Sequence, residues 1–399
     1  MSLDLSKIAS QVIDMVTRFK ADGINRQERL TSALATISDK QLDLENLKKK
    51  IAASKTTWLV AGLVDGLDSH YAPTPLPPDF TIMATDGSHI DVDRHRSTRC
   101  FLINIGRVVL RYGANPDAIL DATPTLYAGD EDLVIMSPEA TNRQQPIEGA
   151  LLGVKRGTEE CRRLAELASE QPPDSPTLAL LDGSLILWGL EAYPDFVGET
   201  LLNKGLLVHL ERMRKLAKDR PLALASYISY PRGTDVLNAL RVSLCPHEVV
   251  NSDRDCATCK TRECDAVAGV RDRELVGELL QQGERSALFI SQSSVVEKHY
   301  GEHRVYFFYL KADDEIARVE IPQWVAQNQN LLNLTHTLVL DQCHRGQGYP
   351  VALSEAHEQA VVREADRQNF WALVDSSLTD EHQSISVSGK SFSKRTRWI

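Results

Sequence analysis

The tripeptide Asp-Gly-Ser occurs twice in this chain of 399 residues, each time at the end of an apolar run. Asp86-Gly87-Ser88 follows the run at 81–85, and Asp182-Gly183-Ser184 follows the run at 178–181. A short apolar run that stops at Asp-Gly is typical of a buried strand that ends in a turn. Each strand would then present a carboxylate at one end of a sheet. Asp-Gly-Ser is also a common turn sequence, so a purely structural interpretation stays open.

Two carboxylates at the ends of neighbouring strands repel each other strongly when they lie close together. A divalent cation relieves this repulsion, and a metal ion held by paired acids is an arrangement used for phosphodiester cleavage. We therefore predict that Asp86 and Asp182 are metal ligands, with Mn²⁺ or Mg²⁺ as the ion.

The order of the predicted elements favours a particular fold. After the first strand come a hairpin at 100–110, a helix at about 146–168 and the second Asp-Gly-Ser strand. Strand, hairpin, helix and strand, with acids ending the first and last strands, is the order of a ribonuclease H-like core. We expect further strands at 222–229, 286–291, 305–310 and 317–321, and a last helix at about 354–370. The predicted fold class is α/β, with a mixed sheet flanked by helices.

A third acid is expected early on the helix that precedes the second Asp-Gly-Ser strand. About 8 helical residues follow Glu160, or roughly 12 Å, which matches the roughly 16 Å of the strand at 177–181. About 20 residues follow Glu148, or roughly 30 Å, which would overshoot unless the helix breaks at Gly157. The lengths favour Glu160 and leave Glu148 as the alternative, and both acids could simply be solvated.

A second informative stretch runs over 348–357 and contains Tyr349 and His357. Ser354 is a candidate N-cap, which would place His357 in the first turn of a helix. There the helix dipole disfavours the imidazolium and leaves the ring free to bind a metal or to accept a proton. The Tyr349 hydroxyl, on the preceding loop, could contact a phosphate. The alternative for His357 is a structural role.

The remaining segments flank this core. Apolar residues at helical spacing predict a helical N-terminal extension over 1–70, which makes a homodimer through these helices a further expectation. A Pro-rich linker at 71–79 leads into the main domain at 80–374, and 375–399 read as a mobile basic tail.

A Cys-rich insertion at about 245–264 holds five soft ligands within 20 residues. They are Cys245, His247, Cys256, Cys259 and Cys264. Cys-x-x-Cys is the usual half of a tetrahedral zinc site, so we predict a structural Zn²⁺ here. An iron–sulfur cluster and unmetallated thiols stay open as alternatives.

Composition sets bounds on the class of protein. The formal net charge of −10 argues against a surface coated for nucleic acid but permits a local basic channel. No apolar run reaches the length of a membrane span, and the first residues do not resemble a secretory signal. Seven unevenly spaced cysteines do not suggest a secreted disulfide framework, so we expect a cytoplasmic protein.

Four stretches, taken in order, resemble the NurA nuclease domain over roughly residues 80–370. They are 85–88, 181–185, 318–322 and 348–357. The resemblance implies a ribonuclease H-like, manganese-dependent nuclease that acts on single-stranded DNA and on duplex ends from the 5′ side. It also implies a homodimer that works with the hexameric motor ATPase HerA in DNA end resection.

The resemblance also assigns roles to residues. Asp86 and Asp182 would be metal ligands, with Glu160 as the third acid, and His357 and Tyr349 would complete the site. The family often has a Lys after its middle strand, where this chain has none at 227–230, and Arg232 is the candidate substitute. A different class also stays open, a catalytically silent adaptor that binds DNA or the ATPase.

Overall fold

The computed structural model describes residues 4–38, 43–96, 98–139 and 143–381. They form two compact units, each built from separate stretches of the chain. Unit 1 contains Met1–Pro73, Ile228–Ser294 and Tyr306–Val319. Unit 2 contains Thr74–Tyr227, Val295–Val305 and the chain from Glu320 onward. None of the described helices combines the length and the apolar character that a membrane crossing requires.

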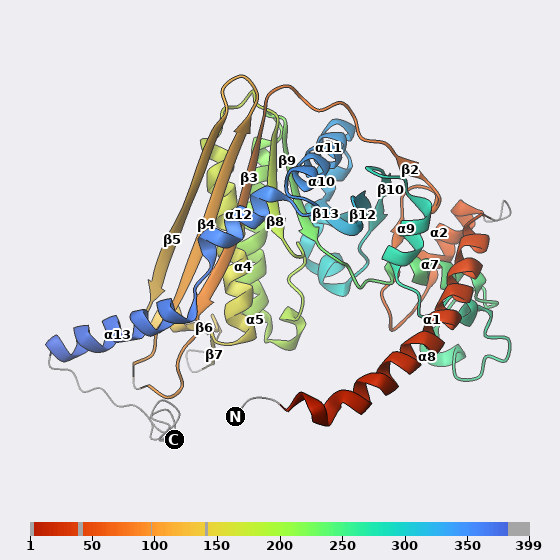
Figure 1. The fold of residues 1–399 in the computed structure, drawn as a ribbon, viewed down its shortest axis with the longest axis horizontal. Helices are drawn as coiled ribbons and strands as arrows, with labels where there is room; N and C mark the ends of the chain where they lie inside the picture. The colour runs from red at the N-terminus through yellow and green to blue at the C-terminus, as the bar shows by residue number, and fades with distance from the viewer. Residues whose placement is uncertain (1–3, 39–42, 97, 140–142, 382–399) are drawn as a thin grey trace. The chain divides into compact units, whose positions relative to one another are not determined.

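The strands of unit 2 form a mixed sheet, as predicted (Figure 1). Its order is β9-β8-β3-β4-β5. Strands β3, β8 and β9 run parallel, whereas β4 lies antiparallel to both β3 and β5. The bounds are β3 Phe80–Ile90, β4 Phe101–Tyr112, β5 Asp117–Tyr127, β8 Thr177–Asp182 and β9 Leu222–Ile228. Both apolar runs that precede Asp-Gly are therefore strands, and they lie next to each other. Only β8 ends at its aspartate as predicted. The prediction that the first strand stops in a turn at Asp86 is wrong, because β3 continues to Ile90 and stays paired with β4.

Helices α4 (Ala150–Glu170) and α12 (Val351–Ala360) cover opposite faces of this sheet (Figure 1). The Thr85 hydroxyl donates to the carbonyl of Glu160 on α4, whereas the Ser88 hydroxyl donates to the carbonyl of Ala360 on α12. Because alternate residues of a strand point to opposite faces, odd positions of β3 face α4 and even positions face α12. Close packing of α12 requires Gly106, since a methyl group there would lie 2.3 Å from the carbonyl oxygen of Ala356.

Helix α4 is amphipathic and buries one face in the core of unit 2. It begins after Gly149, whose φ of +58° suits glycine, and it ends just before the Pro172-Pro173 loop. Its buried residues recur at helical spacing. They are Leu151, Leu152, Thr158, Glu160, Cys161, Leu164, Ala165, Leu167 and Ala168. Glu160 is the one acid in this set, which makes it exceptional on the buried side of the helix.

Further elements complete unit 2. Strands β6 (Val134–Met136) and β7 (Gln144–Pro146) form a separate hairpin. The other elements are α3 Asp130–Leu133, the 3₁₀ helix Leu190–Ala192, α5 Asp195–Gly198, the π-helix Glu199–Leu206, α6 Leu207–Leu216, the π-helix Val296–Tyr300, the 3₁₀ helix Gly301–His303, α10 Gln323–Ala326, α11 Gln329–Arg345 and α13 Glu364–Asp380.

The C-terminal helix differs from its prediction. The predicted single helix at 354–370 is two helices, α12 and α13. Helix α12 begins at Val351, because the Pro350 carbonyl accepts from the N–H groups of Leu353 and Ser354. Ser354 is therefore inside the helix and is not its N-cap. Helix α13 continues to Asp380, beyond the predicted start of the tail at 375, and residues 382–399 of that tail lie outside the described part of the chain.

Unit 1 unites the N-terminal segment with the Cys-rich region in one hydrophobic core. The Lys50 ammonium donates to the Cys245 carbonyl, and the Arg29 guanidinium donates to that of Ala268. The predicted extension therefore shares its packing with 228–294. The helices are α1 Ala9–Ile37, α2 Leu44–Ala53, α7 Asp235–Leu244, α8 Ser252–Asp255 and α9 Asp272–Leu279, with 3₁₀ turns at Leu5–Ile8 and Glu263–Ala266. The strands are β1 Gly62–Leu63, β2 His70–Tyr71, β10 Arg285–Ser286, β11 Phe289–Ile290, β12 Val305–Ala312 and β13 Glu315–Pro322, of which Val305 and the last three residues of β13 belong to unit 2.

Candidate active site

Asp86 and Asp182 occupy equivalent places on adjacent parallel strands. Thr85 of β3 is in register with Leu181 of β8, so the next residue of each strand is an aspartate. In a parallel pair, residues in register point to the same face of the sheet. Burial raises the pKa of Asp182, and the charge of Asp86 raises it further. The two carboxylates therefore lie within electrostatic range of each other where the pairing of β3 with β8 ends, while β3 itself continues to Ile90 beside β4.

Asp86 is held by His357. The Nδ1 atom of His357 lies 2.7 Å from Oδ2 of Asp86, and the Gly87 N–H donates to the other carboxylate oxygen at 2.8 Å. The His357 side chain is 61% exposed, so its outer edge faces solvent. The prediction that His357 lies in the first turn of its helix is wrong, because α12 starts early and His357 falls in its last turn. The dipole argument for a neutral ring therefore does not apply.

Asp182 has a different partner, Tyr349. A hydrogen bond from Tyr349 lowers the pKa of Asp182 and so opposes the effect of burial. The Tyr349 ring packs edge-on against the buried Tyr227 of β9, with ring centroids 5.4 Å apart. The hydroxyl of Tyr227 in turn donates to the carbonyl of Gly348 at 3.4 Å. These contacts fix the loop that leads into α12.

Glu160 approaches the two aspartates from the α4 side of the sheet. It is 8% exposed, and burial raises its pKa to about 7. The charge of Arg156 lowers that pKa, whereas Asp86 and Asp182 raise it, so all three acids are within electrostatic range. The alternative acid, Glu148, precedes α4 and forms an ion pair with Arg94 at 3.1 Å. Of the two candidates, Glu160 is the one that the structure brings to the aspartates.

Glycine at position 87 is what allows Glu160 to reach this place. A methyl group at Gly87 would lie 2.6 Å from Oε1 of Glu160 and 2.9 Å from Cγ of Arg156. The Nε atom of Arg156 lies 3.0 Å from that same Oε1. Sequence reasoning missed Arg156, although its position four residues before Glu160 on a helix was a usable signal.

Glu320 is a second residue that sequence reasoning left without a role. It is 1% exposed, and its Oε2 accepts from the Ser184 hydroxyl at 2.8 Å and from the Leu185 N–H at 3.0 Å. Ser184 also accepts from the Ile186 N–H and from the indole of Trp188. Glu320 thus fixes the loop that follows Asp182. The signal was the stretch 318–322, which carries this acid.

The donor chemistry of the site fits a hard divalent cation. Carboxylate oxygens are the ligands that Mg²⁺ and Mn²⁺ prefer, and Oε1 of Glu160 is buried without a hydrogen-bond partner. Within the described residues, however, no three His, Cys, Asp or Glu side chains are close enough together to hold one ion. Each carboxylate is instead engaged by its own partner. Asp86, Asp182 and Glu160 are the residues that would hold the ion.

The cysteines of the insertion lie in unit 1. Cys245 follows α7, Cys256 follows α8, and Cys264 is in a 3₁₀ turn. Burial raises the pKa of Cys264 and the charge of Arg241 lowers it, while the charges of Asp265, Cys245 and Cys256 raise it, so the three thiols are within electrostatic range of one another. Among the described residues, no three His, Cys, Asp or Glu side chains are arranged as a metal site. The Zn²⁺ site that these three cysteines would form with His247 and Cys259 therefore stays a prediction.

Arg232 is an exposed residue of unit 1. Its contact with a phosphate also stays a prediction.

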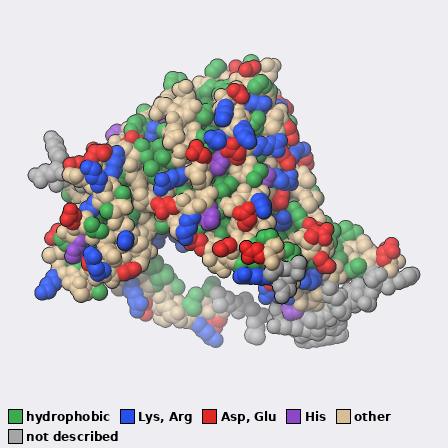
Figure 2. Space-filling model, turned by 180° about the vertical axis from the view of Figure 1, so that it is seen from behind, with side chains coloured by type: hydrophobic (Ala, Val, Ile, Leu, Met, Phe, Trp, Pro, Cys, Tyr) green, Lys and Arg blue, Asp and Glu red, His purple; other side chains and the backbone are tan. Residues whose placement is uncertain are grey.

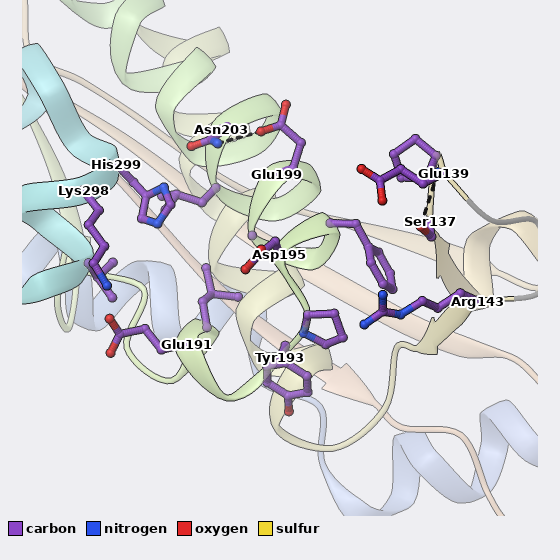
Figure 3. A pocket seen from close by; sticks show the side chains of 17 residues that line it. Ser137, Glu139, Arg143, Glu191, Tyr193, Asp195, Glu199, Asn203, Lys298 and His299 are labelled. Atoms are coloured by element: carbon purple, nitrogen blue, oxygen red, sulfur yellow. Dashed lines mark hydrogen bonds between the residues drawn. The ribbon is translucent and has the colours of Figure 1, made fainter.

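A separate cavity of about 730 Å³ lies elsewhere in unit 2 (Figure 3). It is lined by residues around β6 and β7, by the segment after Gly189 and by the π-helix Val296–Tyr300. Its charged lining mixes Arg143, Lys298 and His299 with four acids, Glu139, Glu191, Asp195 and Glu199. None of the five predicted catalytic residues lines it.

The family model described as "NurA domain" matches residues 80–362, from the first residue of β3 to just beyond α12. The matched region contains Asp86, Glu160, Asp182, Tyr349 and His357. Among curated proteins, none matches this chain. Since the family match covers well over half of the sequence, the chain belongs to the NurA domain family, a family of nucleases.

Proposed function

We propose that this protein is a metal-dependent DNA nuclease, a 5′–3′ exonuclease and single-strand endonuclease that processes DNA ends. The observation that carries the proposal is the register of β3 and β8, in which Asp86 and Asp182 directly follow the last paired residues, Thr85 and Leu181. Two carboxylates in this arrangement favour a divalent cation, and Mn²⁺ is the ion that we propose.

The residues of the site have distinct roles in this proposal. Asp86, Asp182 and Glu160 would hold the ion, which when bound activates water and stabilises the charge on the phosphate. His357, oriented by Asp86, accepts a proton at its solvent-facing nitrogen as water attacks phosphorus and the bond to the leaving oxygen breaks. Tyr349 orients Asp182, and its hydroxyl would contact the phosphate.

DNA binding would depend on local contacts in this proposal. The formal net charge is −10, and Figure 2 shows basic and acidic side chains mixed over the visible face. A charged surface of this kind favours recognition of a few phosphates at one site over a broad basic track.

The experiment compares cleavage of end-labelled DNA in Mn²⁺ by the wild type and by Asp86→Asn. Loss of one carboxylate of the pair should lower the rate by at least about a hundredfold. Asp121→Asn is the matched control, because Asp121 is an exposed aspartate on β5 of the same sheet and is paired with Arg107. Equal cutting by the wild type and Asp86→Asn would contradict the proposal.

We also propose a homodimer that works with a HerA-like hexameric ATPase. Helix α1 supports the dimer, because the face that buries Leu30 and Ala33 in unit 1 continues toward the N-terminus with Val12 and Phe19 exposed. Val12 is 44% and Phe19 63% exposed. Light scattering should show a dimer for the wild type and a monomer for Phe19→Asp. A monomeric wild type would exclude the dimer.

One observation favours the adaptor as a second candidate function. Each carboxylate is engaged by a partner of its own, and no three ligands are assembled among the described residues. Calorimetry with Mn²⁺ discriminates between the two functions. An adaptor would bind DNA or the ATPase without binding Mn²⁺, whereas a nuclease must bind the ion.

A further inference from the structure

Arg156 and Glu160 form an ion pair that differs from the other ion pairs of α4. The Glu160 side chain is 11% exposed and that of Arg156 is 34% exposed, so Arg156 reaches from the buried carboxylate toward solvent. Nε of Arg156 and Oε1 of Glu160 lie 3.0 Å apart. Both atoms are nevertheless buried without a hydrogen-bond partner. The two charges neutralise each other, but neither group is fully satisfied.

The pair lies directly behind Asp86. It fills the space beside Gly87, where even a methyl group would collide with both side chains. Further along the same face of β3, burial lowers the pKa of His89, and the charge of Arg156 lowers it further, whereas that of Asp91 raises it. Arg156 is therefore within electrostatic range of both Glu160 and His89 on this face of β3.

The Arg156 guanidinium can pair with either of two anions, the Glu160 carboxylate or a phosphate of bound DNA. Without a divalent cation, the buried Glu160 carboxylate holds it. When Glu160 serves as a ligand, its charge is neutralised by the ion, and the attraction that keeps Arg156 against it weakens. Guanidinium groups bind phosphate well because their N–H donors match the phosphate oxygens. The nearest phosphates would then be those of the DNA strand at the site.

We propose that Arg156 is a cation-dependent phosphate-binding residue, which neutralises Glu160 in the cation-free protein and turns to a DNA phosphate once a divalent cation holds Glu160. This inference rests on the proposed nuclease function. It assigns to α4 the phosphate contact for which the chain lacks the family's lysine.

The test measures how the affinity for a single-stranded oligonucleotide depends on salt. One additional phosphate contact steepens the plot of log K against log salt by about 0.7 for a single strand. Ca²⁺ replaces Mn²⁺, and gels verify that the oligonucleotide stays intact. The wild type should gain about 0.7 in slope when Ca²⁺ is added, whereas Arg156→Gln should gain nothing.

Three further variants separate this role from structural support of Glu160. Arg156→Lys keeps the charge and should regain the steeper slope. Glu160→Gln releases Arg156 and should show the steeper slope even without Ca²⁺. Arg162→Gln is the matched control, since Arg162 forms an i,i+4 ion pair with Glu166 on the same helix, and it should behave like the wild type.

The outcomes separate the inference from the proposed function. If the wild type cleaves DNA in Mn²⁺ and Arg156→Gln shows the same change in slope as the wild type, the inference is wrong. The proposed nuclease function is then unaffected. A wild type that neither binds Mn²⁺ nor cleaves DNA overturns the nuclease function and, with it, the inference. Steeper slopes for the wild type with Ca²⁺ and for Glu160→Gln without it support the exchange of anions.

Discussion

Replacing Glu160 by Gln should stabilise the cation-free protein at alkaline pH and much less at acid pH. Burial raises the pKa of Glu160 from 4.5 to about 7. A carboxyl whose pKa is raised by folding binds its proton more tightly in the folded state. Its contribution to stability is therefore fully present below pH 4.5 and is lost as the pH rises toward 7.

The magnitude follows from the shift. Each pKa unit corresponds to about 1.4 kcal/mol, so a shift from 4.5 to about 7 lowers the stability by about 3 kcal/mol once both states are ionised. Part of this loss has already occurred at pH 5, where the unfolded state is mostly ionised. Between pH 5 and pH 8 the stability advantage of Glu160→Gln over the wild type should grow by about 2.5 kcal/mol.

Urea unfolding in EDTA, followed by tryptophan fluorescence, measures this difference at the two pH values. Glu166→Gln is the control on the same helix. Partial burial raises the pKa of Glu166, but hydrogen bonds and charges from Arg163 and Arg162 outweigh it and lower that pKa. Its effect on stability should therefore be the same at pH 5 and pH 8. The reasoning fails if the advantage of Glu160→Gln is also independent of pH.

Three further predictions concern the neighbourhood of the site and the insertion. Gly87→Ala should abolish most DNA cleavage in Mn²⁺ assays, because the added methyl group would collide with Glu160 and Arg156. Retained activity would show that cleavage does not need the Arg156–Glu160 pair in this position. Glu320→Gln should lower the midpoint of urea unfolding by an amount equivalent to about 1–2 kcal/mol, since it weakens the hydrogen bonds from Ser184 and Leu185, and an unchanged midpoint would contradict this. Elemental analysis should find one zinc per chain in the wild type and less in Cys256→Ser, and a zinc-free wild type would exclude the predicted site.

The strands that carry the aspartates could be predicted from sequence because their signal is local. Each apolar run is followed by Asp-Gly, and the helix between them has its own periodicity. The prediction of a hairpin within 100–110 is wrong, because that stretch is the single strand β4, which forms its hairpin with β5. The order of these elements then limits the ways in which the two strands can pair. The structure confirms the mixed sheet flanked by helices, and it places Asp86 and Asp182 directly after the last paired residues of β3 and β8, Thr85 and Leu181.

The features that could not be predicted depend on contacts between distant residues. Helix α12 begins about one turn before its predicted start, because the Pro350 carbonyl accepts the first hydrogen bonds of the helix. The sequence alone favours Ser354 as the N-cap, since serine is a common residue at that position. The grouping of the N-terminal segment with residues 228–294 depends on a shared core that includes Leu30 and Leu240, and no periodicity within either segment reveals that the two pack together.

The internal partners of the three carboxylates explain how this end of the sheet can fold without a metal. Three acids without partners in a partly buried site would destabilise the fold. In this structure each acid has a stabilising partner, and the three partners come from different segments of the chain. His357 on α12 holds Asp86, Tyr349 on the preceding loop holds Asp182, and Arg156 on α4 holds Glu160. Because these partners are independent, a bound ion need not break all three contacts at once. The one contact that combines a buried carboxylate with a permanently charged partner is that of Glu160 with Arg156, so the arrival of a cation should change this pair more than the other two.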